Sequence, residues 1–199
     1  YASKSITITQ ATPTLTFTAS TSVLTYNGSA QNIGTISYDG DGKFYYVVST
    51  STTAPSTGWT EASSGTTIKS SAATAATYYV YLKSAAGTNY VAASATSKGS
   101  KAIGKANGSG SISMTGWTYG NAVTNPTVTS NPNNTSVTYE WYPEDGLPAG
   151  TISKPGSTSD VGTYTVRAIF GETANYKSYT TSLVSFNISK RPVTFTAKT

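Results

Sequence analysis

Apolar and β-branched residues alternate with polar ones along most of the chain. The alternation is clearest at Ile6 and Ile8, Leu15 and Phe17, 79–82, 163–168, and Val193 and Phe195. A two-residue period is that of a β-strand with one buried face, and no 3.6-residue period runs long enough for a helix of normal length. The pattern therefore predicts an all-β chain and places the apolar members of these runs on buried faces.

Turn-forming residues interrupt the predicted strands at close intervals. They are Asn27-Gly28, Asp39-Gly40-Asp41-Gly42, Ala86-Gly87-Thr88-Asn89, Asn131-Pro132-Asn133-Asn134 and Asp145-Gly146-Leu147-Pro148. Asn-Gly and Asp-Gly pairs supply the positive φ that tight hairpins require. Many short strands with such turns indicate a β-sandwich or barrel.

The chain also repeats itself. Tyr78 precedes the Asn-Tyr tyrosine Tyr90 by twelve residues, and Tyr164 precedes Tyr176 by the same spacing. Each of the two earlier tyrosines is followed two residues later by Val. A shared internal spacing of this kind indicates duplicated domains.

Three similar junctions, each closing one strand and leading into the next, lie at 8–11, 103–106 and 188–191. They predict two repeats, 11–105 and 106–190. Residues 1–10 are then the last strand of a preceding repeat or the start of the first sandwich, and 191–199 are the first strand of a following repeat. The chain is expected to be a monomeric piece of a longer array.

Composition narrows the function classes. The 199 residues include no Cys and no His, and 11% are charged, which excludes a disulfide scaffold and metal sites built from Cys or His. The net charge of +5 comes from a scarcity of acids, and the lysines are scattered singly or in pairs. Because nucleic-acid binding needs clustered cations, no nucleic-acid partner is predicted.

Two further features bear on location. No apolar run approaches the ~18 residues of a membrane-spanning helix, so no membrane insertion is predicted for this segment. A surface rich in Ser and Thr and poor in Lys favours an extracellular or cell-surface location.

Catalytic groups are few. The serines lack any His base, and Glu140 with Glu144 or Asp145 is the only local carboxylate pair that could act as glycosidase acid and base. Glu144 and Asp145 are followed by Gly146 and are more simply interpreted as a solvated turn. The sequence therefore predicts no enzyme, no catalytic residue and no cofactor.

Asp39 and Asp41 alternate with glycines, as carboxylate ligands of calcium do in Gly-rich loops. The loop lacks the further acidic ligands of an EF-hand. A plain β-turn is therefore the preferred interpretation, a weakly bound cation is the alternative, and no metal site is predicted.

Aromatic residues raise the alternative of carbohydrate binding, because exposed rings can stack on sugar faces. The candidates are Trp59, Trp141 and Tyr142, followed by Trp117, Tyr38, Tyr45 and Tyr46. Alternation along a strand turns one member of each adjacent pair outward, so Trp141 and Tyr142 either expose one ring or cover it with a loop. One Trp in each sandwich is expected in the core.

The run Asp160-x-Gly162-x-Tyr164-x-Val166 resembles the corner element of immunoglobulin-like sandwiches. The resemblance implies that the tyrosine is buried and that its hydroxyl bonds back to the turn before the strand. Val166 stands where antibody domains place Cys, so packing must replace the disulfide. In the first repeat Tyr78 keeps this place, although Asp and Gly are lost.

The chain as a whole resembles bacterial immunoglobulin-like repeats of the MBG type. The matching motifs are Leu24-Thr25-Tyr26-Asn27-Gly28 or Trp117-Thr118-Tyr119-Gly120-Asn121, then Gly162-Thr163-Tyr164, Ala174-Asn175-Tyr176 and Phe186-Asn187-Ile188-Ser189-Lys190. The first repeat departs most between Asp39 and Thr67, where it has extra residues.

This resemblance implies two tandem immunoglobulin-like β-sandwich domains and a place in large secreted or cell-wall proteins, many of them adhesin-like. The expected function is a non-enzymatic structural or adhesion module, a set of stalk repeats, whose partner is a host or cell-wall glycan or protein. A carbohydrate-binding module appended to a secreted glycan-active protein is the alternative.

Overall fold

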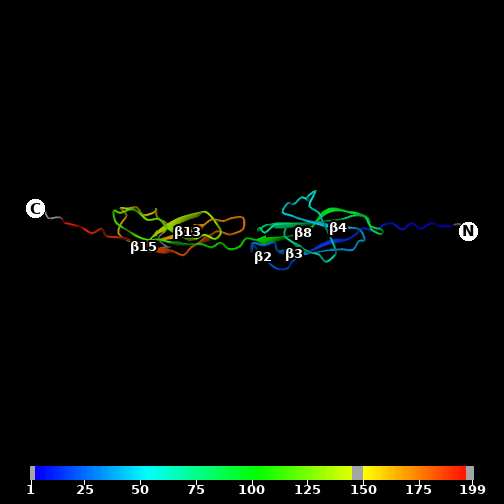
Figure 1. Ribbon diagram of the computed structural model, residues 1–199, viewed down its shortest axis with the longest axis horizontal. Coiled ribbons are helices and arrows are strands. Elements are labelled where there is room, and N and C mark those ends of the chain that lie inside the picture. The colour runs from blue at the N-terminus through cyan, green and yellow to red at the C-terminus, as the bar shows by residue number, and fades with distance from the viewer. Residues whose placement is uncertain (1–2, 145–149, 196–199) are drawn as a thin grey trace. The chain divides into compact units, whose positions relative to one another are not determined.

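The computed structural model describes residues 3–144 and 150–195, and this part of the chain is all-β, without a helix (Figure 1). The prediction of an all-β chain is confirmed. The chain forms two compact units, Tyr1–Lys105 (unit 1) and Ala106–Thr199 (unit 2).

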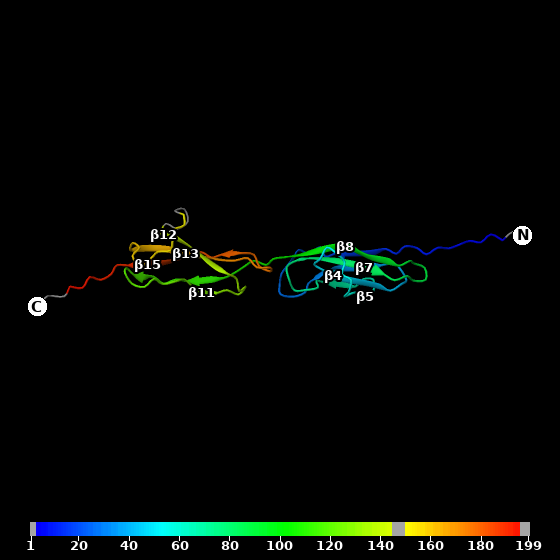
Figure 2. The ribbon, with the colours of Figure 1, turned by 90° about the horizontal axis from the view of Figure 1, so that it is seen from above.

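Unit 1 consists of two sheets. Its strands are β1 (Leu15–Ala19), β2 (Leu24–Thr25), β3 (Asn32–Tyr38), β4 (Phe44–Ser49), β5 (Thr60–Ala62), β6 (Thr67–Lys69), β7 (Thr77–Ser84) and β8 (Ala93–Gly104). One sheet has the order β1-β3-β6 and the other β2-β8-β7-β4-β5. Figure 2 shows β8, β7, β4 and β5 side by side. All pairs are antiparallel except β2 with β8.

The core of unit 1 lies between these sheets. Phe17 and Ile36 come from the first sheet, and Val80 and Leu82 come from β7 in the second; all four are buried. Alternate residues of a strand point to opposite faces, so the polar neighbours of these residues lie outside. The arrangement is sandwich-like, and Leu15 and Phe17 have the buried positions that the alternation predicts.

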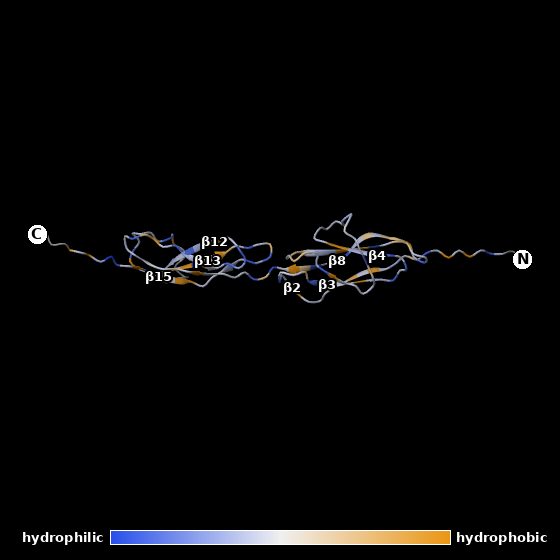
Figure 3. Cartoon of the chain, viewed as in Figure 1, coloured by the Kyte–Doolittle hydropathy of each residue, from blue (hydrophilic) through white to orange (hydrophobic). Residues whose placement is uncertain are grey.

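Unit 2 follows the same plan with fewer strands. They are β9 (Ser111–Ser113), β10 (Trp117–Thr118), β11 (Thr127–Ser130), β12 (Val137–Pro143), β13 (Gly162–Phe170), β14 (Tyr179–Thr180) and β15 (Val184–Ser189). The larger sheet has the order β10-β15-β13-β12, with β14 also on β13, and β11 pairs with β9. Buried Trp117, Trp141, Val166 and Phe186 form much of the core. Figure 3 shows hydrophobic residues within strands such as β15.

The first residue of each predicted repeat, Ala11 or Ala106, pairs with the tyrosine of the Asn-Tyr motif. Ala11 forms a parallel bridge with Tyr90, and Ala106 forms one with Tyr176. Each bridge has two backbone hydrogen bonds of 2.8–2.9 Å. The repeated spacing in the sequence therefore corresponds to a repeated backbone contact where each sandwich begins.

A second contact recurs where each unit ends. The Tyr26 N–H donates to the Gly104 carbonyl at 2.8 Å, and the Tyr119 N–H donates to the Ser189 carbonyl at 2.9 Å. These bonds extend the parallel pairing of β2 with β8 and of β10 with β15. The last strand of each unit is thus joined in parallel to a short strand near the beginning of that unit.

Both corner tyrosines bond back to the chain four residues earlier. The Tyr164 hydroxyl donates to the Asp160 carbonyl at 3.0 Å. The Tyr78 hydroxyl lies 2.9 Å from the carbonyls of Thr74 and Ala72, either of which it can donate to. The predicted hydrogen bond is confirmed in both units.

The predicted burial holds for only one of the two tyrosines. Tyr78 is completely buried, whereas Tyr164 is half-buried and lines a surface cavity together with Lys154 and Asp160. Val80 and Val166, the residues that follow them on the inner face, are both fully buried as predicted.

The alternating segments outside the two sandwiches do not lie on a buried face. Ile6 and Ile8 are 89% and 93% exposed, and Val193 and Phe195 are 75% and 93% exposed. The prediction of burial is wrong here because no sheet lies against these residues in the described part of the chain. Alternation shows that a segment is suited to a strand, but burial needs a neighbouring sheet.

Candidate functional site

Trp59 lies on the outer face of the larger sheet of unit 1. The connection between β4 and β5 brings it there, and its indole Nε1 donates to the Pro55 carbonyl at 3.1 Å. The Lys83 ammonium lies 4.2 Å from the centre of the indole ring and 5.7 Å from the Tyr45 ring. The hydrogen bond and the cation–π contacts fix a half-buried indole beside a lysine.

Strand register explains this grouping. Tyr45 on β4 stands opposite Lys83 on β7 and opposite Glu61 on β5, and residues directly opposite share a face of the sheet. Glu61 also pairs with Lys43 at 3.0 Å, both side chains being largely exposed. The hydrogen bond that the Lys43 ammonium donates to Glu61 raises the pKa of Lys43.

A surface cavity of about 360 Å³ adjoins these rings. It is lined by Tyr45, Trp59, Lys83, Ser84 and Ala85. Of the three leading stacking candidates, Trp59, Trp141 and Tyr142, Trp59 is therefore the one that retains a half-buried ring beside an open space.

Trp141 and Tyr142 do not present an accessible ring. Trp141 is 7% exposed and lies in the core, edge-on to Phe186 with ring centres 5.8 Å apart. Tyr142 points to the outer face but is 2% exposed, with the Arg167 guanidinium 5.4 Å from its ring centre. Burial thus removes both residues from the stacking candidates, and Trp117, 6% exposed, is a core residue as well.

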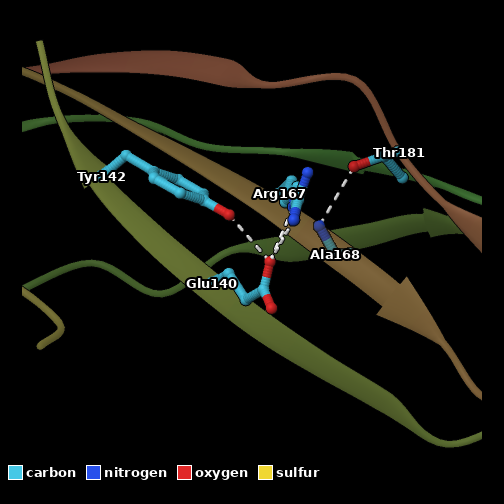
Figure 4. A network of polar contacts seen from close by, with 5 residues as sticks. All are labelled: Glu140, Tyr142, Arg167, Ala168 and Thr181. Atoms are coloured by element: carbon cyan, nitrogen blue, oxygen red, sulfur yellow. Dashed lines mark hydrogen bonds and ion pairs between the residues drawn. The ribbon is translucent and has the colours of Figure 1, made fainter. Parts of the chain in front are cut away.

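Tyr142 belongs to a polar network on the outer face of unit 2 (Figure 4). Glu140 Oε2 accepts hydrogen bonds from the Tyr142 hydroxyl at 2.8 Å and from Arg167 Nε at 2.7 Å, and Arg167 Nη2 is also 2.7 Å away. The Tyr142 hydrogen bond, followed by that of Arg167, lowers the pKa of the Glu140 carboxyl. Burial raises the pKa of Tyr142.

This network does not suit Glu140 to general acid catalysis. A glycosidase acid needs a raised pKa so that it holds a proton near neutral pH, whereas the pKa of Glu140 is lowered. Its proposed partner Asp145 lies outside the described residues, and Glu144 is exposed. The described geometry of Glu140 is that of a structural ion pair.

Asp39 and Asp41 bond to different segments of unit 1. Asp39 Oδ1 accepts the Thr14 N–H at 2.6 Å, and this bond lowers the pKa of the Asp39 carboxyl. Asp41 Oδ2 accepts the backbone and side-chain N–H groups of Asn89 at 2.8 and 2.9 Å. Each carboxylate thus braces the turn against a neighbouring segment. Residues 3–144 and 150–195 contain no group of three or more His, Cys, Asp or Glu placed to hold a metal ion.

Sequence reasoning missed Lys83 and Arg167, the two cations that organise the outer faces. A weak signal exists, because alternation along β7 puts Tyr79, Tyr81 and Lys83 on one side of the strand. The cross-strand partners of the two cations cannot be read from the sequence without the register.

Comparisons of the chain with protein-family models, curated proteins and solved structures each return no significant match. Within the described ranges there is also no helix with the length and apolar character needed to cross a bilayer.

Proposed function

We propose that the chain is a non-enzymatic structural and adhesion module, a pair of tandem immunoglobulin-like stalk repeats, in a bacterial surface or secreted protein. One observation carries the proposal. In each unit the chain enters beside the beginning of the last strand segment and leaves at the end of that segment, so that entry and exit lie at opposite ends. Such a unit adds length between the segments of chain on its two sides.

The geometry is simplest in unit 1. Ala11 enters beside Tyr90, just before β8, and the chain leaves at Gly104, the last residue of β8. Fourteen residues of extended chain span roughly 45 Å. In unit 2 the entry bridge at Tyr176 and the exit at Ser189 are separated by a similar length of chain.

This connectivity resists a pulling force. In unit 1 the beginning of the chain and β8 run in parallel, joined by the bridge at Ala11 and the Tyr26 bond to Gly104. Tension applied to the two ends slides these segments past one another, so the hydrogen bonds are loaded together in shear. Bonds loaded together resist more force than bonds that open one after another.

Two features support the immunoglobulin-like assignment and the location. The corner hydroxyls of Tyr78 and Tyr164 bond to the carbonyls four residues earlier, as in the tyrosine corner of such sandwiches. The resemblance to MBG-type repeats supports an extracellular or cell-surface location. The lowered pKa of Glu140 supports the non-enzymatic assignment, because its carboxyl is held in an ion pair.

Single-molecule force spectroscopy tests the proposal. Pulling the chain by its ends is expected to give two unfolding steps of about 250–300 Å each, the length released by roughly 80–95 residues. Tyr26→Pro removes the N–H that bonds to Gly104 and should lower the unfolding force of unit 1 only. Tyr119→Pro is the matched change in unit 2. A force for unit 1 that is unaffected by Tyr26→Pro contradicts the mechanical role of this bond.

A further inference from the structure

We propose that the cavity beside Trp59, on the outer face of unit 1, binds an acidic sugar: a pyranose that carries a carboxylate. This site adds recognition to the spacing role and does not depend on it. The proposal rests on three properties of the cavity, namely its oriented aromatic rings, its lysine and its size.

The rings are held in place before any ligand arrives. The Trp59 indole is fixed by its bond to the Pro55 carbonyl, and Tyr45 is the second residue of β4, a strand that is paired on both sides. Both rings are half-buried and border the same cavity. Preorganised aromatic surfaces beside a few polar groups are typical of small-molecule sites, and the apolar face of a pyranose matches such a ring.

The lysine supplies the charge preference. Lys83 has three N–H donors, and its described contacts are with the faces of Trp59 and Tyr45, which attract the positive charge but offer no lone pair. The nearby carboxylate of Glu61 is bonded to Lys43. Lys83 forms no ion pair in the described residues. Its ammonium can therefore donate hydrogen bonds to a negatively charged group of a ligand.

Further details fit a sugar. The volume of about 360 Å³ lies at the small end of ligand sites, suitable for one or two sugar rings. The net charge of +5 favours the approach of an anionic polymer.

Unit 2 contains a similar pair of residues in a different setting. Lys154 lies 5.8 Å from the Trp141 ring centre, but Trp141 is buried and the Lys154 ammonium also donates to the Asn125 side-chain carbonyl. This pair has no accessible ring to stack on. It therefore provides a matched control with the same loss of charge.

The test is an NMR titration of the ¹⁵N-labelled full chain with a short oligogalacturonate. We expect shifts at the Trp59 indole N–H and around Tyr45, and much weaker shifts with the fully methyl-esterified oligomer, which keeps the rings but loses the charge. Acetate at the same carboxylate concentration should leave the Trp59 signal unchanged, because it has no ring.

Two substitutions test whether the oligomer binds at the cavity beside Trp59. Lys83→Gln keeps most of the side-chain stem and should weaken binding about tenfold or more, as expected for losing a charge-assisted hydrogen bond. Lys154→Gln should bind like the wild type. Equal binding of the esterified oligomer, equal loss in both variants, or no shift at Trp59 would each overturn the proposal.

Discussion

The outer faces of the larger sheets differ between the two units at equivalent positions. Aligning Val80 with Val166 makes the cross-strand pair Val47 and Tyr81 equivalent to Glu140 and Arg167. In unit 1 the pair is apolar and buried. In unit 2 it is a partly exposed ion pair.

The groups that pack over the outer face of the larger sheet also differ between the two units. In unit 1 the connection after β4 folds over the sheet: the Tyr81 hydroxyl donates to the Ser51 carbonyl at 2.9 Å, and Trp59 follows in the same connection. In unit 2 the network around Glu140 occupies this face. The shared features are the core and the entry and exit contacts, so chemistry specific to one unit is found on the outer face and in its connections.

The largest expected effect comes from the core. Leu82→Ala creates a cavity in unit 1 and should lower its free energy of unfolding by about 2–5 kcal/mol. The equivalent position in unit 2 already holds Ala168, which is buried beside larger aromatic residues. Calorimetry should show a lower transition temperature for unit 1 and an unchanged one for unit 2.

Val23→Ala is the matched control, because Val23 is 94% exposed in the same unit and its truncation should change stability by less than about 0.5 kcal/mol. If Leu82→Ala destabilised both units equally, the two cores would not be independent.

The corner tyrosines should give a smaller and unequal effect. Tyr78→Phe removes the hydroxyl of a fully buried side chain together with its hydrogen bonds to the Ala72 and Thr74 carbonyls, and should cost about 1–3 kcal/mol. Tyr164 is half-buried, so water can replace its hydroxyl at the Asp160 carbonyl, and Tyr164→Phe should cost about 0.5–1 kcal/mol. Chemical denaturation of each variant measures both. Equal losses would show that burial does not set the value of this bond.

The sequence predicts those features that depend on local pattern. Alternation identifies the strands and the inner positions of Val80 and Val166, and the Asp160-x-Gly162-x-Tyr164 motif predicts the corner bond. The Asn-Gly pair at Asn27 predicts a turn, and Gly28 has the positive φ of 79° that it requires.

Alternation along a strand does not predict which side chain packs over an outward-facing ring. It places one of Trp141 and Tyr142 outward, but the guanidinium above Tyr142 belongs to Arg167, which is distant in sequence. The Lys83 and Trp59 contact likewise needs the register of β4 against β7 and the path of a connection. Ile6 and Phe195 are a second case in which alternation is insufficient. Their pattern suits a strand, but no sheet in the described residues covers them.

The smallest expected effect is the pH dependence that Glu140 gives to unit 2. The pKa of Glu140 is lowered below its ordinary value of 4.5 in the folded state, so the unfolded chain binds this proton more readily. The resulting stabilisation is present above pH 4.5 and is lost as the pH falls through the folded pKa. Thermal unfolding between pH 6 and 3 should show this loss.

Glu140→Gln should reduce the fall in the unfolding temperature of unit 2 between pH 6 and 3, which is called its acid limb below. The unfolding temperature of unit 1 should not change. Glu61→Gln, in the exposed ion pair of unit 1, should leave the acid limb of unit 2 as it is in the wild type. An acid limb that persists unchanged in Glu140→Gln would assign the dependence to another group.

The most direct test of the account is whether each unit folds alone. The ¹H–¹⁵N spectra of segments 11–105 and 106–191, prepared separately, should each be well dispersed. Together they should reproduce the spectrum of the full chain, apart from the signals of residues 1–10 and 192–199 and of residues near Lys105 and Ala106. Collapsed spectra for either segment, or shifts spread through the cores around Leu82 and Phe186, would contradict two independent sandwiches.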